Sequence, residues 1–511
     1  MKATMTPAAD APSSRVDPAP AYREARRLAG KVLLDGRLQD PITDQRLQVV
    51  NPATLEVIAS VPRCGAADVA RAVASAAKAF PAWARTPARE RGRLLAQGAD
   101  ILQAHAEELA LLQTLETGHP IAALSRGDVA TAIDMLRMFA GLAGELKGRT
   151  VPDVPGVVHY TTCEPLGVVA AIIPWNGPVF TMSAKIGPSV IAGNTLVIKV
   201  AEEAPFAVLR ACELLQSVLP PGVLNVISGR GEEAGRPLAE HPAVKKVTFT
   251  GSVPVGQQIM GYVAPKLCQV TLELGGSNPN IVAADADLEL AIPGIVAGMR
   301  YARMSQSCIA GSRIFVHADV YDRVVETVVE RVGRLVVGDP LDEKTQIGAL
   351  SSQRQFDRLT GVLERVRATP GARILCGGGR PGDARLAQGL FMQPTLIDGV
   401  ANSASLCQEE VFGPLGFFIR WTGHDEVITA ANATPYGLIA TLWTQDIGKA
   451  LDFVSRIQAG LVQVNNYNGP RPNVSYGGMK MSGLGKEYSL ESMVQHFTFS
   501  KTVLLGGGRR P

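Results

Sequence analysis

A lysine and a glutamate are spaced to bind sugar hydroxyls. Lys199 ends a short apolar run, and Glu202 follows three residues later. An ammonium and a carboxylate at the end of a parallel strand can hydrogen-bond the two ribose hydroxyls of an adenosine, and the carboxylate would repel a 2′-phosphate. The pair therefore favours NAD over NADP as a ligand, with an ordinary surface ion pair as the alternative.

The loop Thr250–Gly256 has the composition of an anion-binding turn. It places Gly251 and Ser252 directly after another apolar run. Small residues at a strand-to-helix turn let backbone N–H groups approach a phosphate. The segment lacks the GxGxxG spacing, so glycines that only shape a turn are the alternative.

Cys308 is the candidate nucleophile. It lies in the segment Gln306–Arg313, directly before a predicted strand. A thiolate is an effective side-chain nucleophile near neutral pH, although a lone cysteine is most often a small buried apolar residue. The chain has seven cysteines and seven histidines at dispersed positions. This dispersion predicts neither a disulfide framework nor a metal site, and it favours a reducing, cytoplasmic location.

Apolar runs alternate with predicted helices between Leu166 and Gly276. The predicted strands are Gly167–Ile173, Thr195–Val200, Val223–Ser228, Val244–Thr250 and Gln269–Leu274, and the helices are Ser183–Ala192, Pro205–Leu219, Glu232–His241 and Val255–Val263. Short, wholly apolar strands are typical of a parallel sheet that is buried on both faces. We therefore expect a right-handed doubly wound sheet, which binds dinucleotides at its carboxyl edge.

The rest of the chain predicts a second α/β domain and a small bridging sheet. Two β-rich segments, Gly156–Cys163 and Phe497–Leu505, have no partner nearby in the sequence. The expected division is a disordered arm at 1–28, a dinucleotide-binding domain at 29–144 and 166–273, a catalytic domain at 274–480, and a bridging element at 145–165 and 481–511.

The composition points to a small-molecule partner. Of 511 residues, 46% are hydrophobic and 19% are charged, as in globular proteins rather than disordered chains. Lys and Arg number 50 and Asp and Glu 47, and a net charge of +3 gives no reason to expect nucleic acid or an anionic membrane. The most apolar run stops at Pro174, far short of the ~20 residues that span a bilayer.

Taken together, the motifs resemble those of the aldehyde dehydrogenase superfamily. They are Trp175-Asn176, Glu273-Leu274-Gly275-Gly276, Gln306-Ser307-Cys308, Glu410-Val411-Phe412-Gly413-Pro414, Tyr476-Gly477-Gly478 and Ser482-Gly483, in the family's order. The resemblance covers nearly the whole chain. It implies the aldehyde dehydrogenase fold: α/β, with a Rossmann-like NAD-binding domain, an α/β catalytic domain and a small β oligomerisation element. It also implies a homodimer or homotetramer.

The resemblance implies three catalytic roles. Cys308 matches the nucleophile that adds to the aldehyde, giving a thiohemiacetal that can release a hydride to NAD. Asn176 matches the amide that stabilises the oxyanion together with the N–H of the cysteine. Glu273 matches the base that activates water against the resulting thioester, so the expected product is the free carboxylic acid.

The resemblance also implies the residues that bind NAD. Lys199 and Glu202 match the ligands of the adenosine ribose, and Ser252 matches the residue beside the pyrophosphate. The other expected positions are Gly251 in the same loop, Glu410 at the nicotinamide ribose, Phe412 against the nicotinamide, and Trp175 and Phe249 as lining of the cleft.

The substrate pocket is expected to be wide. Gly177, Thr181 and Ala184 occupy places where relatives that act on small aldehydes often carry aromatic residues. Tyr476 keeps one aromatic wall, and Arg471 is a candidate anchor for an anionic group, with a solvated loop arginine as the alternative. The expected substrate is a bulky aromatic, terpenoid or long-chain aldehyde.

Other functions stay open on the sequence alone. One is a coenzyme A-acylating enzyme, although that branch generally lacks the glutamate matched by Glu273. Another is a semialdehyde dehydrogenase whose substrate bears a carboxylate. The third is a non-catalytic or structural relative, comparable to the lens crystallins that resemble this family, which would have no reason to keep Cys308, Asn176 and Glu273 together.

Overall fold

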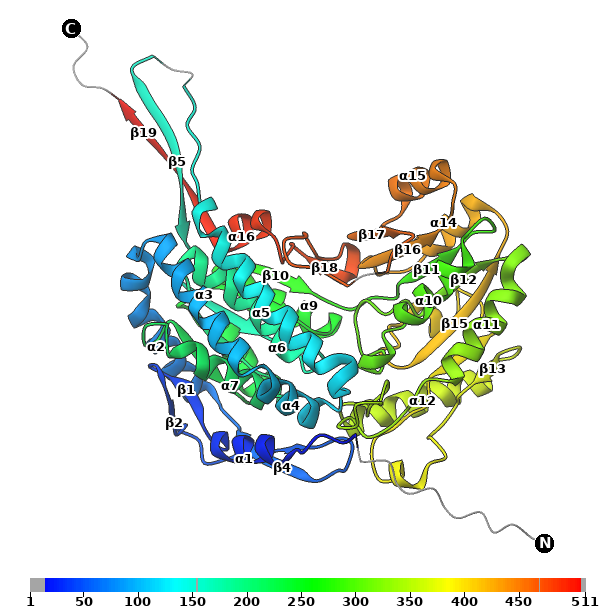
Figure 1. Cartoon of the computed structure of the whole chain (residues 1–511). Helices are drawn as coiled ribbons and strands as arrows, with labels where there is room; N and C mark the ends of the chain where they lie inside the picture. The colour runs from blue at the N-terminus through cyan, green and yellow to red at the C-terminus, as the bar shows by residue number, and fades with distance from the viewer. Residues whose placement is uncertain (1–13, 153–154, 468, 507–511) are drawn as a thin grey trace.

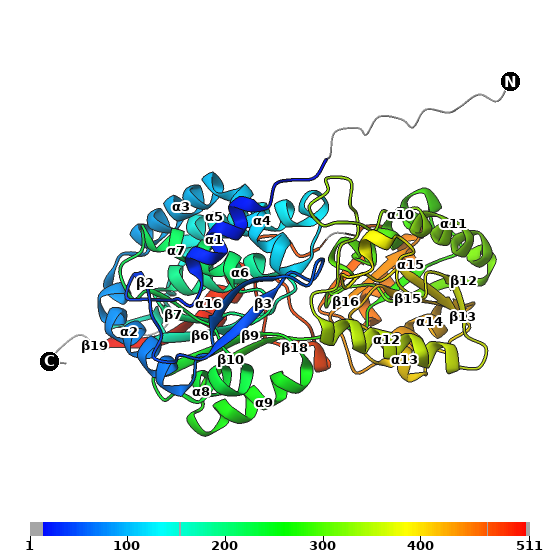
Figure 2. The same cartoon turned by 90° about the horizontal axis from the view of Figure 1, so that it is seen from below.

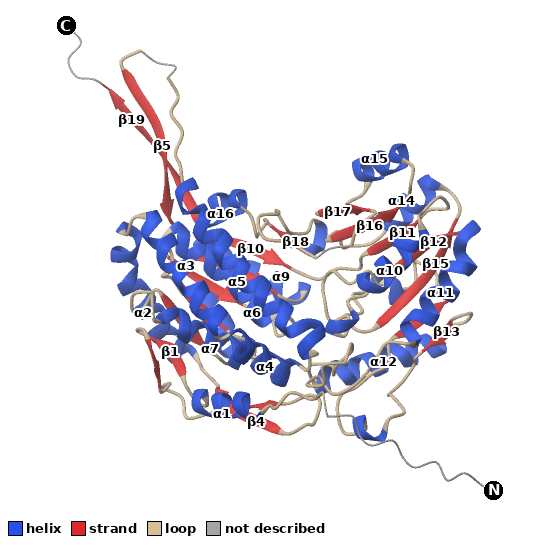
Figure 3. Ribbon diagram, viewed as in Figure 1, coloured by secondary structure: helices blue, strands red, loops and turns tan. Residues whose placement is uncertain are grey.

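Two α/β lobes stand side by side in the computed structural model, and a two-stranded ribbon projects from one of them (Figure 1). The structure describes residues 14–152, 155–467 and 469–506. Seen from below in Figure 2, the N-terminal half of the chain forms most of one lobe, residues 279–464 form the other, and the C-terminal segment returns to the first lobe. Strands occupy the centre of each lobe and helices flank them (Figure 3).

The first lobe contains an eight-stranded sheet in the order β18-β10-β9-β6-β7-β8-β1-β2. Its strands are β1 (Val32–Leu34), β2 (Arg37–Gln39), β6 (Val168–Ile172), β7 (Thr195–Lys199), β8 (Leu224–Ile227), β9 (Val244–Thr250), β10 (Gln269–Glu273) and β18 (Gly483–Leu484). The five central strands are parallel, and β18, β1 and β2 join antiparallel at the edges. The chain order reverses between β6 and β9, which makes that point the expected ligand site of a doubly wound sheet.

Helices cover both faces of this sheet because its strands are apolar on both sides. Val169 and Ala171 of β6 pack into one core, while the alternate residues Val168 and Ala170 pack into another. The helices of the first core include α3 (Ala88–Ala104), α4 (Ala106–Thr117), α5 (Arg126–Gly141), α6 (Pro178–Ala192) and α7 (Phe206–Gln216), and those of the second include α2 (Ala66–Arg85), α8 (Arg236–Glu240) and α9 (Val253–Val263). This double burial explains the unbroken apolar runs of the sequence.

The second lobe contains a seven-stranded sheet in the order β13-β14-β15-β12-β11-β16-β17, parallel except for β13. Its strands are β11 (Pro279–Val282), β12 (Arg313–His317), β13 (Arg373–Cys376), β14 (Thr395–Asp398), β15 (Leu415–Trp421), β16 (Ile439–Trp443) and β17 (Leu461–Val464). Its helices are α10 (Leu288–Gly298), α11 (Tyr321–Gly333), α12 (Gln353–Ala368), α13 (Ser405–Gln408), α14 (His424–Asn432) and α15 (Ile447–Arg456).

The projecting ribbon consists of β5 (Val157–Pro165) and β19 (Thr498–Gly506), which pair antiparallel along their full length. These are the two segments that had no partner nearby in the sequence, and they are partners of each other. Helix α16 (Leu490–Phe497) leads into β19, and a separate hairpin pairs β3 (Arg46–Val50) with β4 (Val57–Pro62). Phe499 and Leu504 of the ribbon are more than half exposed.

One expectation for the N-terminus is wrong in part. Residues 1–28 were expected to be a disordered arm, but Ala19–Leu28 form helix α1, whose apolar face buries Ala21, Ala25 and Leu28. A helix with one apolar stripe gains stability by packing it against a core, which composition alone does not reveal. Residues 1–13 lie outside the described part.

For the remaining domain boundaries, we propose the division into domains expected from the sequence, since each sheet draws nearly all its strands from one of the expected ranges.

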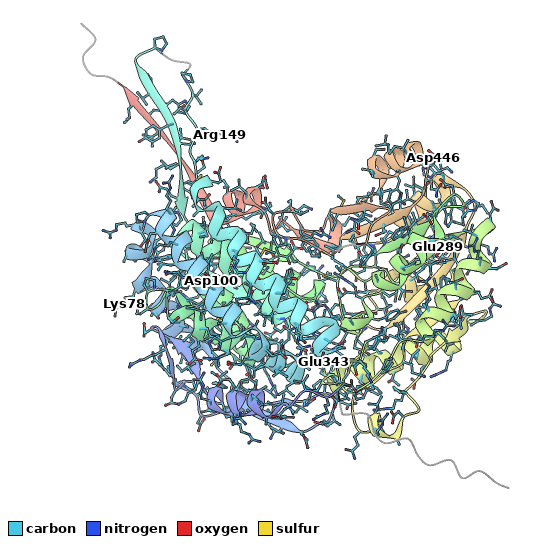
Figure 4. The ribbon with its side chains drawn as sticks, in the orientation of Figure 1. Lys78, Asp100, Arg149, Glu289, Glu343 and Asp446 are labelled. Atoms are coloured by element: carbon cyan, nitrogen blue, oxygen red, sulfur yellow. The ribbon has the colours of Figure 1, made fainter. Side chains whose placement is uncertain are left out.

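Charged side chains are dispersed over the exterior. Lys78, Asp100, Glu289, Glu343 and Asp446 lie on the outside of both lobes, and Arg149 lies beside the ribbon (Figure 4). Among the described helices, none has the length and apolar character needed to cross a membrane. The described residues also contain no group of three or more His, Cys, Asp or Glu side chains that could hold a metal ion.

Candidate active site

A cavity of about 1060 Å³ lies where the carboxyl ends of the first sheet face the second lobe. Residues that follow β6 and β9 line it on one side, and the segment before β12 lines it on the other. This volume lies at the upper end of what ligand pockets usually offer. The cavity therefore has room for a large cofactor and a substrate together.

Cys308 lies half-buried in the wall of this cavity, on the turn before β12. Asn278 fixes that turn: its Nδ2 donates to the carbonyls of Cys308 at 2.8 Å and Ala310 at 2.9 Å. Gly276 permits the close approach, since a Cβ there would lie 2.4 Å from the Cys308 carbonyl oxygen. The backbone of the candidate nucleophile is thus held by the segment that connects the two sheets.

Asn176 is oriented by the same turn. Its Nδ2 donates to the carbonyl of Gln306 at 2.8 Å. An asparagine amide carries two N–H donors, so one N–H orients the side chain and the second is available to an oxygen beside Cys308. Arg303 donates to the backbone carbonyl of Asn176 and forms a 2.6 Å ion pair with Asp128.

The thiol of Cys308 has a hydroxyl group as its neighbour. The Tyr476 hydroxyl lies 3.6 Å from Cys308 Sγ, and the Tyr476 ring stacks on Tyr488 with centroids 5.0 Å apart. Burial raises the pKa of the Cys308 thiol to about 11, while the hydrogen bond with Tyr476 acts in the opposite direction. Tyr476 is therefore the side chain that favours the thiolate most directly.

Glu273 ends β10 and faces the cavity as a buried carboxyl group. It is 3% exposed, and neither side-chain oxygen has a hydrogen-bond partner among the described residues. Burial raises the pKa of Glu273 well above its usual value, and the Glu487 carboxylate adds to the effect. Such a group takes up a proton more readily than an exposed glutamate, as a general base requires.

A buried ion pair lies behind Glu273. Lys185 and Glu487 are almost fully buried and meet at 2.5 Å, and the Thr248 hydroxyl donates to the same oxygen of Glu487 at 2.9 Å. A buried pair of this kind needs such additional hydrogen bonds to offset the loss of hydration. It sets much of the electrostatic environment in which Glu273 titrates.

The residues expected to bind a dinucleotide gather at the first-lobe end of the cavity, and three observations fit that ligand. Lys199 is 4% exposed and contacts Glu202 at 3.1 Å, which leaves both groups at the cavity wall for a ribose diol. Helix α9 begins after Ser252, whose side chain makes no capping hydrogen bond. The hydroxyl of Thr250 is buried without a partner among the described residues. A helix start with free donors suits a pyrophosphate.

Glu410 and Phe412 line the same cavity from the second lobe. Glu410 Oε1 accepts a 3.0 Å hydrogen bond from the N–H of Gly276, and burial raises the pKa of Glu410 to about 7. Phe412 adopts a φ of +49° and packs edge-on against Trp175, with ring centroids 5.5 Å apart. Such backbone strain in a non-glycine residue is typical of functional sites.

Of the residues expected in the substrate pocket, Gly177, Thr181, Tyr476 and Arg471 line the cavity, and Ala184 does not. Ala184 is fully buried in the core of the first lobe, so its expected role in the pocket is wrong. Two aromatic residues that the sequence analysis did not identify narrow the substrate end of the cavity. They are Phe180 and Tyr488, whose rings lie edge to face at 5.5 Å.

All the other predicted site residues line the cavity, whereas several supporting side chains were missed. The catalytic candidates there are Cys308, Asn176 and Glu273, and the cofactor candidates are Trp175, Lys199, Glu202, Phe249, Gly251, Ser252, Glu410 and Phe412. The supporting residues that the sequence did not reveal include Asn278, Arg303 and Asp128. Arg303 and Asp128 are 175 positions apart, and no local pattern links residues so distant.

Comparison with known proteins shows the family to which the chain belongs. Residues 40–503 match the aldehyde dehydrogenase family. Hydroxyisobutyraldehyde dehydrogenase of Mycolicibacterium austroafricanum is 40% identical over 446 residues, covering 87% of each chain. Retinaldehyde dehydrogenase 3 of Rattus norvegicus is 38% identical over 480 residues, covering 93% of this chain and 92% of the relative.

A solved structure agrees as well. The NAD+ complex of aldehyde dehydrogenase from Bacillus cereus superposes with a TM-score of 0.93 at 34% identity, over 96% of this chain and 99% of the other. The match therefore includes both lobes rather than one domain. With a family match over most of its length, this chain belongs to the aldehyde dehydrogenase family.

Proposed function

We propose that this protein oxidises an aldehyde to the free carboxylic acid, with Cys308 as nucleophile, Asn176 at the oxyanion and Glu273 as the base. The observation that carries the proposal is that these three side chains line one cavity together with the dinucleotide-binding candidates. Bound NAD supplies the acceptor for the hydride that the adduct on Cys308 releases. The Bacillus cereus relative, solved as an NAD+ complex, supports this choice of cofactor.

The first step is addition of the Cys308 sulfur to the aldehyde carbon. As the C–S bond forms, the carbonyl oxygen gains negative charge, which the second N–H of Asn176 and the backbone N–H of Cys308 would stabilise. Loss of one such donor typically costs ~3–4 kcal/mol of transition-state stabilisation. The Tyr476 hydroxyl stabilises the thiolate before the attack.

The second half of the reaction is hydrolysis of a thioester on Cys308. Glu273 takes a proton from a water molecule as the water oxygen adds to the acyl carbon. The C–S bond then breaks, and sulfur leaves as the thiolate while the carboxylic acid departs. The coenzyme A-acylating alternative is disfavoured because Glu273 is present and buried at the cavity.

NAD is favoured over NADP at the adenosine end of the cavity. Glu202 pairs with Lys199 there. A carboxylate at Glu202, beside the ribose, would repel the 2′-phosphate of NADP.

The proposed substrate is a large aldehyde: aromatic, terpenoid or long-chain. The cavity volume and the absence of bulk at Gly177 and Thr181 support it. The relatives include a hydroxyisobutyraldehyde dehydrogenase and a retinaldehyde dehydrogenase at nearly equal identity, so sequence identity does not decide the size of the substrate. A carboxylate-bearing semialdehyde is the second candidate.

We propose a homodimer or homotetramer in which the ribbon contacts a partner copy. A two-stranded ribbon is only marginally stable by itself. Val158, Phe499, Leu504 and Leu505 are each more than half exposed on it, so a partner surface would bury them. All seven cysteines are free thiols, which supports a reducing compartment such as the cytoplasm.

A substrate panel tests the proposed reaction. Purified protein is mixed with NAD or NADP and with small aliphatic, bulky aromatic, terpenoid and carboxylate-bearing aldehydes, and reduction is followed by absorbance. We expect higher kcat/KM with NAD than with NADP and with large aldehydes than with acetaldehyde. Equal use of both cofactors would contradict the role of Glu202, and a preference for acetaldehyde would contradict the large pocket.

Replacing the nucleophile tests the covalent mechanism. Cys308→Ala should reduce aldehyde oxidation below detection while NAD still quenches tryptophan fluorescence, because the cofactor candidates are untouched. Cys268→Ala, which changes a thiol outside the cavity, is the control and should keep full activity. Appreciable turnover by Cys308→Ala would rule out its role.

Replacing the base tests the hydrolytic step. Glu273→Gln should give a rapid burst of about one NADH per site and then a steady rate at least ~100-fold below normal, because acylation survives and water activation does not. The hydrolysis rate of the unaltered enzyme should rise as pH increases above 4.5, since only the ionised carboxylate accepts a proton, and the variant should lose this dependence. Glu240→Gln is the control. A variant with no burst and normal hydrolysis would contradict the assignment.

Replacing the tyrosine tests the thiolate environment. Tyr476→Phe removes the hydroxyl beside Sγ, so the pKa of Cys308 should rise further and alkylation at pH 8 by iodoacetamide should slow by up to about tenfold. The alkylation rate is measured from pH 7 to 10.5 by mass spectrometry of the Cys308 peptide, with Tyr262→Phe as the control. An unchanged or faster rate in Tyr476→Phe would show that the hydroxyl does not favour the thiolate.

A further inference from the structure

Arg300 is a cavity residue that none of the proposed roles uses. It follows helix α10 and precedes the turn that carries Cys308, and it lines the cavity in a half-buried position. Its φ of +56° and ψ of +41° are left-handed. This conformation is unfavourable for a long side chain, and such strain is common where a side chain serves a ligand.

The guanidinium of Arg300 has no acceptor in the described part of the protein. None of its side-chain nitrogens makes a hydrogen bond or ion pair there, and Nε is buried from solvent. Neighbouring arginines differ: Arg303 pairs with Asp128 at 2.6 Å, and Arg358 donates to the carbonyl of Phe412 at 3.2 Å. Asp134, another acidic residue of the cavity wall, is exposed and forms no ion pair with a described residue.

Aromatic packing holds Arg300 close to the nucleophile. Its guanidinium carbon lies 5.6 Å from the centroid of the Tyr467 ring. The Tyr467 hydroxyl donates to the carbonyl of Ile309 at 3.1 Å, and Ile309 directly follows Cys308. Gly469 leaves room for the guanidinium, since a Cβ there would lie 2.2 Å from Nη2. The cation is thus positioned by its surroundings while its charge is left unpaired.

A partly buried cation without an acceptor is unfavourable, so its retention calls for a ligand that supplies one. A planar guanidinium fits a carboxylate through two parallel hydrogen bonds. Arg471 is the competing anchor, but it is exposed on its loop. Water there already solvates its charge, and the gain from pairing with a substrate is small.

We propose that Arg300 binds a carboxylate carried by the aldehyde substrate at the end remote from its carbonyl. This inference rests on the proposed function and narrows its substrate class to large aldehydes that bear an acidic group. Arg300 then acts as a specificity-determining residue, and the aromatic wall of Phe180 and Tyr488 contacts the body of the substrate.

Two aldehydes of equal size that differ in charge test the proposal. 4-Formylbenzoate and 4-formylbenzamide are compared by kcat/KM with NAD, and the readout is the ratio of the two values. The unaltered enzyme should favour the carboxylate at least tenfold. Arg300→Gln should lower this ratio at least tenfold, Arg300→Lys should lower it less because the charge remains, and Arg334→Gln, at an exposed position directly after helix α11, should leave it unchanged.

Turnover of 4-formylbenzamide by each variant reports whether the protein is folded. A ratio near one in the unaltered enzyme, or an unchanged ratio in Arg300→Gln, would overturn the inference while leaving the proposed oxidation intact. A loss of preference in Arg471→Gln but not in Arg300→Gln would assign the anchor to Arg471 instead. Oxidation of neither aldehyde by the unaltered enzyme would contradict the proposed function, and the inference with it.

Discussion

The short connection between the two sheets is the constraint on which the site depends. Glu273 ends β10 in one sheet, and Pro279 begins β11 in the other. Within this connection, Gly276 donates its N–H to Glu410, and Asn278 holds the carbonyl of Cys308. The proposed base, a cofactor contact and the nucleophile are therefore positioned by one segment of chain. A Cβ at Gly276 would lie 2.4 Å from the backbone carbonyl oxygen of Cys308, so this position requires glycine.

Burial gives the assembled site its chemical character. It raises the pKa of Cys308 to about 11 and of Glu410 to about 7, and it shifts that of Glu273 in the same direction. The resting site consequently carries less negative charge than its composition suggests. Charge that develops on a bound substrate meets fixed dipoles, such as the amide of Asn176, in half-buried surroundings that screen them less than bulk water does. Electrostatic stabilisation is strongest under these conditions.

The sequence predicted the parts of the fold and site that follow from local pattern. The apolar runs from Gly167 to Leu274 predicted the parallel strands of the first sheet to within about two residues, because a strand buried on both faces has no polar positions. Lys199 and Glu202 were placed at a ribose site by their spacing at a strand end, and they do meet at the cavity.

Helix α1 was missed because its stability comes from packing against residues distant in sequence. Ala184 was misplaced because helix α6 enters the core of the first lobe within one turn after Thr181. The pairing of Arg303 with Asp128 and the unpaired charge of Arg300 appear only once the lobes are assembled.

Acylation of Cys308 during turnover is the claim on which all the assigned roles depend. Its most direct measurement is acid quenching of Glu273→Gln protein within the first turnover of benzaldehyde and NAD, followed by digestion and mass spectrometry. The expected result is a benzoyl increment on the Cys308 peptide alone, absent when NAD is omitted. An unmodified Cys308 peptide in a sample that has already formed NADH, or a benzoyl group on another cysteine, would contradict the mechanism.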